Sequence, residues 1–159
     1  MKIMDNNYTV KGLDIANLDD ALNLVLRVFL EFEAPIYCED GVNEFRSFIE
    51  YNSIKAKLTA NEFKMWCCLD KSKVIGVIAV RPPLHISLLF VDKEYHNRGI
   101  ARSMLCEVIS YYKTNGKYHE MTVNSSPYAA EVYHKFGFKD TDTEQTVNGI
   151  RFIPMKCPI

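Results

Sequence analysis

The chain of 159 residues is 48% hydrophobic and 12% aromatic, which supports one domain with a sizeable core and excludes a mainly disordered protein. Its formal net charge of −1 argues against a general nucleic-acid-binding protein. The longest apolar stretch, residues 21–30, contains Asn23 and Arg27 and is too short to span a bilayer, and the N-terminus lacks the apolar run of a signal peptide. We therefore expect a single domain, residues 1–159, in a cytoplasmic protein without nucleic-acid or membrane partners.

The first half of the chain is predicted to pass from helices to strands. A short strand at residues 8–10 precedes a helix in which Asn17 is the cap and apolar residues recur at helical spacing through residues 18–32. After a loop marked by Pro35 and Gly41, further helical segments are expected around residues 45–49 and 54–60. Strands are predicted at residues 64–69, 74–80 and 84–91, and the last of these is almost entirely apolar, as a central strand should be.

The second half alternates strands and helices. We expect a helix over residues 99–112, a strand over 118–123, a helix from Pro127 to Phe136, and closing strands at 138–141 and 150–155 joined through Asn148-Gly149. A strand, a crossover helix and a second strand form a right-handed βαβ unit with parallel strands. The sequence therefore predicts an α/β (α+β) domain with a mixed, mostly antiparallel sheet and helices on both faces.

The cysteines do not form a recognisable framework. Their number is odd, and none of the five, which are Cys38, Cys67, Cys68, Cys106 and Cys157, belongs to a Cys-x-x-Cys pair. This argues against both structural disulfides and a zinc knuckle, so we expect reduced thiols, packed for the most part, and no metal site.

Residues 88–102, with the sequence LLFVDKEYHNRGIAR, lead from a buried strand through a turn into a helix. The first N–H groups of a helix are unpaired and lie at the positive end of its dipole, so this turn suits a phosphate group. Gly99 lets the backbone approach an anion, Ala101 is small, and Arg98 and Arg102 add positive charge. Taken alone, an ordinary strand-to-helix turn would show the same pattern.

The same turn resembles motif A of the GNAT superfamily of acyl-CoA-dependent N-acyltransferases, whose loop reads Gln/Arg-x-x-Gly-x-Gly/Ala. Here the loop reads His-Asn-Arg-Gly-Ile-Ala over residues 96–101, and His96 replaces the usual Gln or Arg. Thirty-four residues after Gly99, Tyr133 and the following Gly137-Phe138 resemble motif B of the family. Ser126 stands where many members have Asn, and Asn124 can serve in its place. The resemblance covers about residues 74–139.

The resemblance implies both a geometry and a co-substrate. In GNAT folds, the strands before the two motifs run parallel and then splay apart at the centre of the sheet, and the pantetheine arm of acetyl-CoA enters the gap. It pairs with main-chain groups of the first strand, while the pyrophosphate lies on the motif A turn. The cofactor-binding residues so implied are Leu89, Phe90, Val91, Asn97, Arg98, Gly99, Ile100, Ala101, Arg102 and Ser126.

The chemistry implied is direct attack of a primary amine on acetyl-CoA in a ternary complex. The resemblance places Tyr133 near the sulfur of CoA, where a phenol that is protonated at neutral pH can act as general acid. On the strand at 84–91, alternation predicts that Leu84, Ile86, Leu88 and Phe90 share one face and that His85, Ser87, Leu89 and Val91 share the other.

His85 is therefore the candidate base, with a pKa of about 6.5. A hydrogen-bonded structural histidine and deprotonation through water are alternatives that stay open. Asn124 is a third candidate catalytic residue, placed to bind the acetyl amide or the acceptor, and Glu120 is a weaker candidate base.

Charge is unevenly distributed along the chain. Residues 1–50 hold four basic and ten acidic side chains, a net charge of −6, whereas residues 51–159 hold fifteen basic and ten acidic ones, a net charge of +5. An uneven solvated surface would give this pattern, but so would an acidic pocket for an amine beside a basic region for the CoA phosphates.

In GNAT proteins the first fifty residues usually shape the acceptor pocket. The acidic and aromatic residues at the end of the first helix and in its loop suit a cationic small-molecule or peptide amine, and they are Phe32, Glu33, Tyr37, Glu39 and Asp40. The sequence therefore predicts an N-acetyltransferase and leaves a homodimer open. The alternative is a non-catalytic acyl-CoA-binding sensor or partner-binding module.

Overall fold

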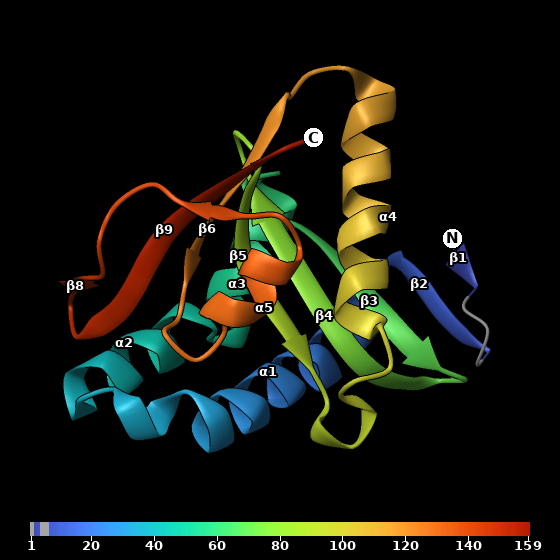
Figure 1. Cartoon of the computed structure of the whole chain (residues 1–159). Helices are drawn as coiled ribbons and strands as arrows, with labels where there is room; N and C mark the ends of the chain where they lie inside the picture. The colour runs from blue at the N-terminus through green and yellow to red at the C-terminus, as the bar shows by residue number, and fades with distance from the viewer. Residues whose placement is uncertain (1, 4–6) are drawn as a thin grey trace.

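The computed structural model describes residues 2–3 and 7–159 and arranges them as one nine-stranded sheet flanked by helices (Figure 1). The strands are β1 (Lys2–Ile3), β2 (Tyr8–Gly12), β3 (Lys64–Asp70), β4 (Lys73–Arg81), β5 (His85–Val91), β6 (Glu120–Ser125), β7 (Lys139–Asp140), β8 (Gln145–Val147) and β9 (Ile150–Pro158). The α-helices are α1 (Leu18–Phe32), α2 (Glu39–Phe48), α3 (Tyr51–Thr59), α4 (Ile100–Asn115) and α5 (Ala130–Lys135). The strand order is β1-β2-β3-β4-β5-β6-β9-β7, and β8 pairs with β9.

Two hydrophobic cores lie on opposite faces of the sheet, which confirms the expected helices on both faces. Helices α4 and α5 bury Met104, Val108 and Tyr133 on one face. Helix α1, together with α2 and α3, covers the other face, where Leu24 and Ile54 are buried (Figure 1). Among the described helices, none has both the length and the apolar character needed to cross a membrane.

Helix α1 begins where the sequence predicts, but its cap differs. Asn17 makes no capping hydrogen bond with its side chain. Asp14 instead caps the preceding 3₁₀ turn, where its Oδ1 accepts a hydrogen bond from the Ala16 N–H at 3.0 Å. Asp19 and Asp20 occupy the first turn of α1, where negative charge is favourable next to the positive end of the helix dipole.

The sheet is mixed and mostly antiparallel, as predicted. The parallel pair is β5–β6, and its register covers only His85 opposite Thr122 and Ile86 opposite Val123. Beyond Ile86, β5 continues to Val91 without further pairing to β6, while β4 stays paired along its other edge. The two central strands therefore separate toward their carboxyl ends, which is where ligands bind in open α/β sheets.

A β-bulge at Ser87 makes the predicted alternation along β5 wrong. Residue Ala79 of β4 pairs with Leu88 while Val80 pairs with Ile86, which leaves Ser87 as an extra residue. An inserted residue shifts every following side chain to the opposite face. Leu84 and Ile86 therefore pack in the core under α4, whereas Leu88 packs in the core under α1.

The bulge also leaves the Ser87 hydroxyl buried without a hydrogen-bond partner among the described residues. A buried hydroxyl that lost its water without a new partner destabilises the fold, so Ser87→Ala should raise the free energy of unfolding by about 1 kcal/mol. Urea denaturation measures this change. Ser72→Ala in an exposed turn is the control, with an expected effect within about 0.5 kcal/mol. A less stable Ser87→Ala protein would mean that the hydroxyl does have a partner.

The C-terminal strands depart from the predicted boundaries. Helix α5 begins at Ala130 rather than Pro127, β7 has two residues, and Asn148-Gly149 joins β8 to β9 rather than linking the two predicted strands. This hairpin turn lies directly against the start of α2. A Cβ atom built on Gly41 would come within 2.2 Å of the Gly149 carbonyl oxygen. Both positions need glycine, because only a bare backbone permits this approach.

All five cysteines are free, as expected, and Cys38 and Cys106 are exposed rather than packed.

Candidate active site

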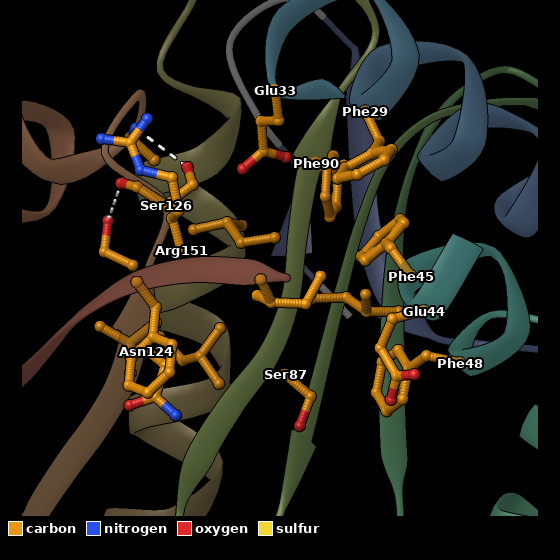
Figure 2. Close-up of a pocket in the computed structure, with 18 of the residues that line it drawn as sticks. Phe29, Glu33, Glu44, Phe45, Phe48, Ser87, Phe90, Asn124, Ser126 and Arg151 are labelled. Carbon is orange, nitrogen blue, oxygen red and sulfur yellow. Dashed lines mark hydrogen bonds between the residues drawn. The ribbon is translucent and has the colours of Figure 1, made fainter. Parts of the chain in front are cut away.

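A cavity of about 360 Å³ opens where β5 and β6 separate (Figure 2). Its walls come from α1, α2, β5, β6, α5 and the β8–β9 hairpin. Of the candidate catalytic and cofactor-binding residues, the cavity brings together His85, Leu89, Phe90, Asn124, Ser126 and Tyr133. Segments far apart in the sequence thus meet at one site.

Tyr133 is buried on α5 and borders the cavity. Phe136 and Phe138 hold its ring from the side, with edge-on contacts at centroid distances of 6.4 and 5.4 Å. Burial raises the pKa of the phenol above its ordinary value of 10, and the negative charge of Glu33 raises it further. Tyr133 is therefore a fixed and protonated hydrogen-bond donor at neutral pH.

His85 also lines the cavity, but its environment is less polar than the sequence implies. Its Nδ1 lies 2.8 Å from the Thr122 hydroxyl, across the short parallel pairing. Burial lowers the pKa of the imidazole to about 4, and the positive charge of Arg81 contributes in the same direction. The ring is therefore neutral at pH 7, and it is a weaker base than a pKa near 6.5 would make it.

Ser126 and Asn124 have different roles at the end of β6. The buried Ser126 hydroxyl oxygen accepts a hydrogen bond from the Ala129 N–H at 3.2 Å, so it stabilises the turn before α5. The same hydroxyl hydrogen-bonds the Glu33 carboxylate. Asn124 is exposed and borders the cavity, where its amide is available to a ligand.

The motif A turn lies outside the residues that line this cavity. Asn97 and Gly99 have positive φ angles of 61° and 76°, and Gly99 directly precedes α4. No side chain caps α4 at Gly99, and a Cβ atom at this position would meet nothing within 4 Å. The turn therefore presents the free N–H groups of a helix start to open space. Ile100 is buried and packs in the core beneath α4.

Side chains of the turn and of the first turn of α4 contact neighbouring parts of the protein. His96 donates a hydrogen bond from Nε2 to the Val91 carbonyl at 2.8 Å, which ties the loop to the end of β5. Arg98 donates to the Tyr8 hydroxyl at 2.8 Å. Arg102 lies over the ring of Phe136, with 5.0 Å between its guanidinium carbon and the ring centroid. Both guanidinium groups thus lie near the start of α4.

The acceptor end of the cavity agrees only in part with the predicted residues. Glu33 and Tyr37 line it, whereas Phe32, Glu39 and Asp40 do not. Phe32 instead stacks on Tyr128, and Glu39 and Asp40 are exposed in the first turn of α2. Glu120 also lies away from the cavity, 4.0 Å from the Lys156 ammonium.

Sequence reasoning missed the residues that α2 and the hairpin contribute. These are Glu44, Phe45 and Phe48 from α2, and Val147, Asn148, Ile150, Arg151 and Phe152 from the hairpin. The helical spacing of Phe45 and Phe48 indicated a buried face, but not that a pocket lies against it. Arg151 is neutralised by Glu144, with N–O distances of 3.0 and 3.1 Å, so its positive charge does not dominate the pocket.

A split sheet, a helix start without a side-chain cap and a pocket at the split are the features that the motif resemblance implies for an acyltransferase that uses acyl-CoA. Comparison with known proteins agrees. A family model described as an acetyltransferase (GNAT) domain matches residues 33–159. The chain therefore belongs to the GNAT acetyltransferase family, and the resemblance of its two motifs is confirmed.

Individual relatives are distant in sequence. The chain is 23% identical over 134 residues to the uncharacterized N-acetyltransferase YafP of Escherichia coli, which covers 84% of this chain and 83% of that protein. The PaiA N-acetyltransferase of Thermoplasma acidophilum, solved with coenzyme A, superposes with a TM-score of 0.80 at 20% identity, over 96% of this chain and 99% of the other. A GCN5-related N-acetyltransferase of Rhodopseudomonas palustris gives a TM-score of 0.83 at 16% identity, over 100% and 99%.

Proposed function

We propose that this protein transfers the acetyl group of acetyl-CoA to a primary amine by direct attack in a ternary complex. The observation that supports the proposal is the cavity between β5 and β6, which the buried and protonated Tyr133 borders. Family membership supports acyl-CoA as one ligand.

Acetyl-CoA would enter along the free edge of β5. Along residues 89–91, β5 has no pairing to β6, so the main-chain groups that point away from β4 are open to the amide groups of a pantetheine arm, apart from the Val91 carbonyl that His96 binds. The pyrophosphate would then lie on the turn from Asn97 to Arg102, including the backbone of Gly99, Ile100 and Ala101, with Arg98 and Arg102 supplying charge. Ser126 would border the acyl end of the same groove.

The chemistry needs a neutral amine, a polarised thioester and a protonated leaving group. The amine nitrogen attacks the thioester carbonyl carbon, and the carbon–sulfur bond breaks as the amide forms. Tyr133 would donate its phenolic hydrogen to the departing sulfur. Asn124 would hydrogen-bond the acetyl group or the acceptor. His85 is the candidate base from the sequence, and a base with a pKa of about 4 would limit the rate only at strongly acidic pH.

The acceptor we propose is a cationic amine. Glu33 and Glu44 face the cavity beside the aromatic rings of Phe29, Phe45 and Phe48, a lining that suits an ammonium group on an apolar body. Among the described pocket residues, the cations are Arg81, His85 when protonated, and Arg151, which Glu144 neutralises.

Glu44→Gln should raise the KM for the amine by about tenfold and leave the KM for acetyl-CoA nearly unchanged, because one charge-assisted contact contributes about 1.5 kcal/mol. Steady-state kinetics with each substrate varied in turn measures both values. Asp40→Asn is a matched control on the same helix, because Asp40 is exposed and does not line the cavity. Equal effects of the two variants would place the amine elsewhere.

A panel of primary amines tests the function itself. Polyamines, amino acids, aminoglycosides and peptides with free N-termini are each incubated with acetyl-CoA while free thiol is measured. Thiol release that depends on one class of amine, with the acetylated product found by mass spectrometry, supports the proposal. Binding of CoA without turnover of any amine would favour the non-catalytic acyl-CoA-binding module.

A further inference from the structure

Glu33 is the acidic side chain most closely surrounded by the machinery of this cavity. It follows the last residue of α1, and its backbone N–H still donates to the Phe29 carbonyl at 2.9 Å, so the helix fixes its position. Figure 2 shows its carboxylate pointing into the cavity beside Ser126. A carboxylate held at this place can contact a ligand without any rearrangement of the backbone.

The groups around Glu33 come from every wall of the cavity. The Ser126 hydroxyl hydrogen-bonds the carboxylate, and the negative charge of Glu33 contributes to the raised pKa values of three neighbouring phenols. Besides Glu33, the titratable and charged groups that line the cavity are Tyr37 after the 3₁₀ turn 34–36, Glu44 on α2, Arg81 on β4, His85 on β5, Tyr133 on α5 and Arg151 on β9, and Tyr128, just before α5, is close enough for the charge of Glu33 to raise its pKa. The phenols are neutral at pH 7, and Arg151 is paired with Glu144.

Burial acts on the two candidate bases in opposite directions. It raises the pKa of Glu33 above the ordinary value of 4.5, against the smaller effect of the Ser126 hydrogen bond. It lowers the pKa of His85 to about 4. The same apolar surroundings disfavour the charged form of a bound ammonium and so lower its pKa. The proton affinities of Glu33 and the amine therefore approach each other, whereas those of His85 and the amine do not.

We propose that Glu33 accepts the proton of the acceptor ammonium, so that it is the general base of this enzyme. The inference rests on the acetyl transfer proposed above and adds to it the origin of the neutral amine. It also explains why a half-buried acidic side chain lines an aromatic pocket, where a charge without a counterion is unfavourable until a cation arrives.

The protons of the reaction then balance. The ammonium gives its first proton to the Glu33 carboxylate, which later releases it to solvent. The neutral nitrogen attacks the thioester carbonyl carbon, and its second proton leaves as the amide forms, which compensates for the proton that the CoA thiolate takes up. The third proton stays on the amide nitrogen.

The test compares Glu33→Gln with Glu33→Asp and with the control Glu31→Gln. Glu31 lies two residues earlier on α1 and outside the cavity, where it pairs with Lys93. Removal of a general base lowers kcat by about 10²-fold or more, so we expect that loss in Glu33→Gln, a smaller loss in Glu33→Asp and no change in Glu31→Gln. The profile of kcat/KM against pH should show an acidic limb that Glu33→Gln abolishes and His85→Gln retains.

A second measurement does not depend on turnover. Folding raises the pKa of Glu33 above its ordinary value of 4.5, so protonated Glu33 stabilises the folded state relative to the ionised form. This stabilisation is complete below pH 4.5 and is lost as the pH rises through the pKa of the folded state. Glu33→Gln has no such group, so its Tm should equal that of the wild type at low pH and exceed it at neutral pH. This result also shows that the variant folds.

The outcomes are separable. If the wild type acetylates an amine and Glu33→Gln is equally active, the inference is wrong and the proposed function stands. The same holds if His85→Gln removes the acidic limb of the pH profile and Glu33→Gln keeps it. A Tm difference between the wild type and Glu33→Gln that does not change with pH also overturns the inference, because the pKa of Glu33 would then be the same in the folded and unfolded states. A wild type that releases no thiol with any amine overturns both.

Discussion

Tyr133→Phe should lower kcat by about 10²-fold while leaving the affinity for acetyl-CoA nearly unchanged, since a positioned general acid contributes about 10²–10⁴-fold and this one belongs at the lower end. The ring should stay in place, because phenylalanine keeps the T-shaped ring contacts that Phe136 and Phe138 make with it. Burial and Glu33 raise the pKa of the phenol, so complete proton transfer to a thiolate is less favourable than from an ordinary tyrosine. Much of the effect must therefore come from hydrogen bonding to the sulfur.

The raised pKa also determines the pH dependence of this step. A phenol with a pKa above its ordinary value of 10 stays protonated through pH 7–10, so the loss of the Tyr133 proton should not reduce kcat in that window. Tyr128→Phe is a matched control, because Tyr128 is exposed and lies just before α5. Single-turnover kinetics separates chemistry from product release. An unchanged chemical rate in Tyr133→Phe would contradict the general-acid role.

The backbone features of the site were predictable because they depend on local sequence. Gly99 adopts the left-handed conformation that the motif requires, and α4 begins at the next residue. The apolar strand ending at Val91 lies at the centre of the sheet, and its parallel partner is the strand that precedes motif B. Each of these features is specified by a short run of residues and by the order of elements along the chain.

The side-chain arrangement was less predictable, because it depends on pairing between distant segments. The bulge at Ser87 is a property of the β4–β5 register, and no residue of β5 alone indicates it. Glu44 and Asp40 are acidic residues one turn apart on α2, yet of the two only Glu44 borders the cavity, and their spacing in the sequence does not distinguish them. The low pKa of His85 likewise follows from burial, which a sequence does not show.

Gly99→Asp should weaken acetyl-CoA binding by about five- to 700-fold, whereas Gly99→Asn should change it little. Two like charges about 4 Å apart repel by about 1 kcal/mol in bulk water and by about 4 kcal/mol near a protein surface. A difference of about 1.4 kcal/mol changes a dissociation constant tenfold. The pair is matched, because Asp and Asn have the same shape and both tolerate the left-handed backbone conformation that Gly99 adopts at φ 76°. The open space around this position accepts either side chain.

Loss of folding would not explain such a result. A negative charge at the start of α4 lies at the positive end of the helix dipole, so Gly99→Asp should be at least as stable as Gly99→Asn. Calorimetric titration with acetyl-CoA gives the two dissociation constants, and thermal denaturation gives the two stabilities. The ratio of the dissociation constants should shrink as salt is raised, because repulsion between exposed charges is screened. Equal dissociation constants for two folded variants would place the pyrophosphate away from this turn.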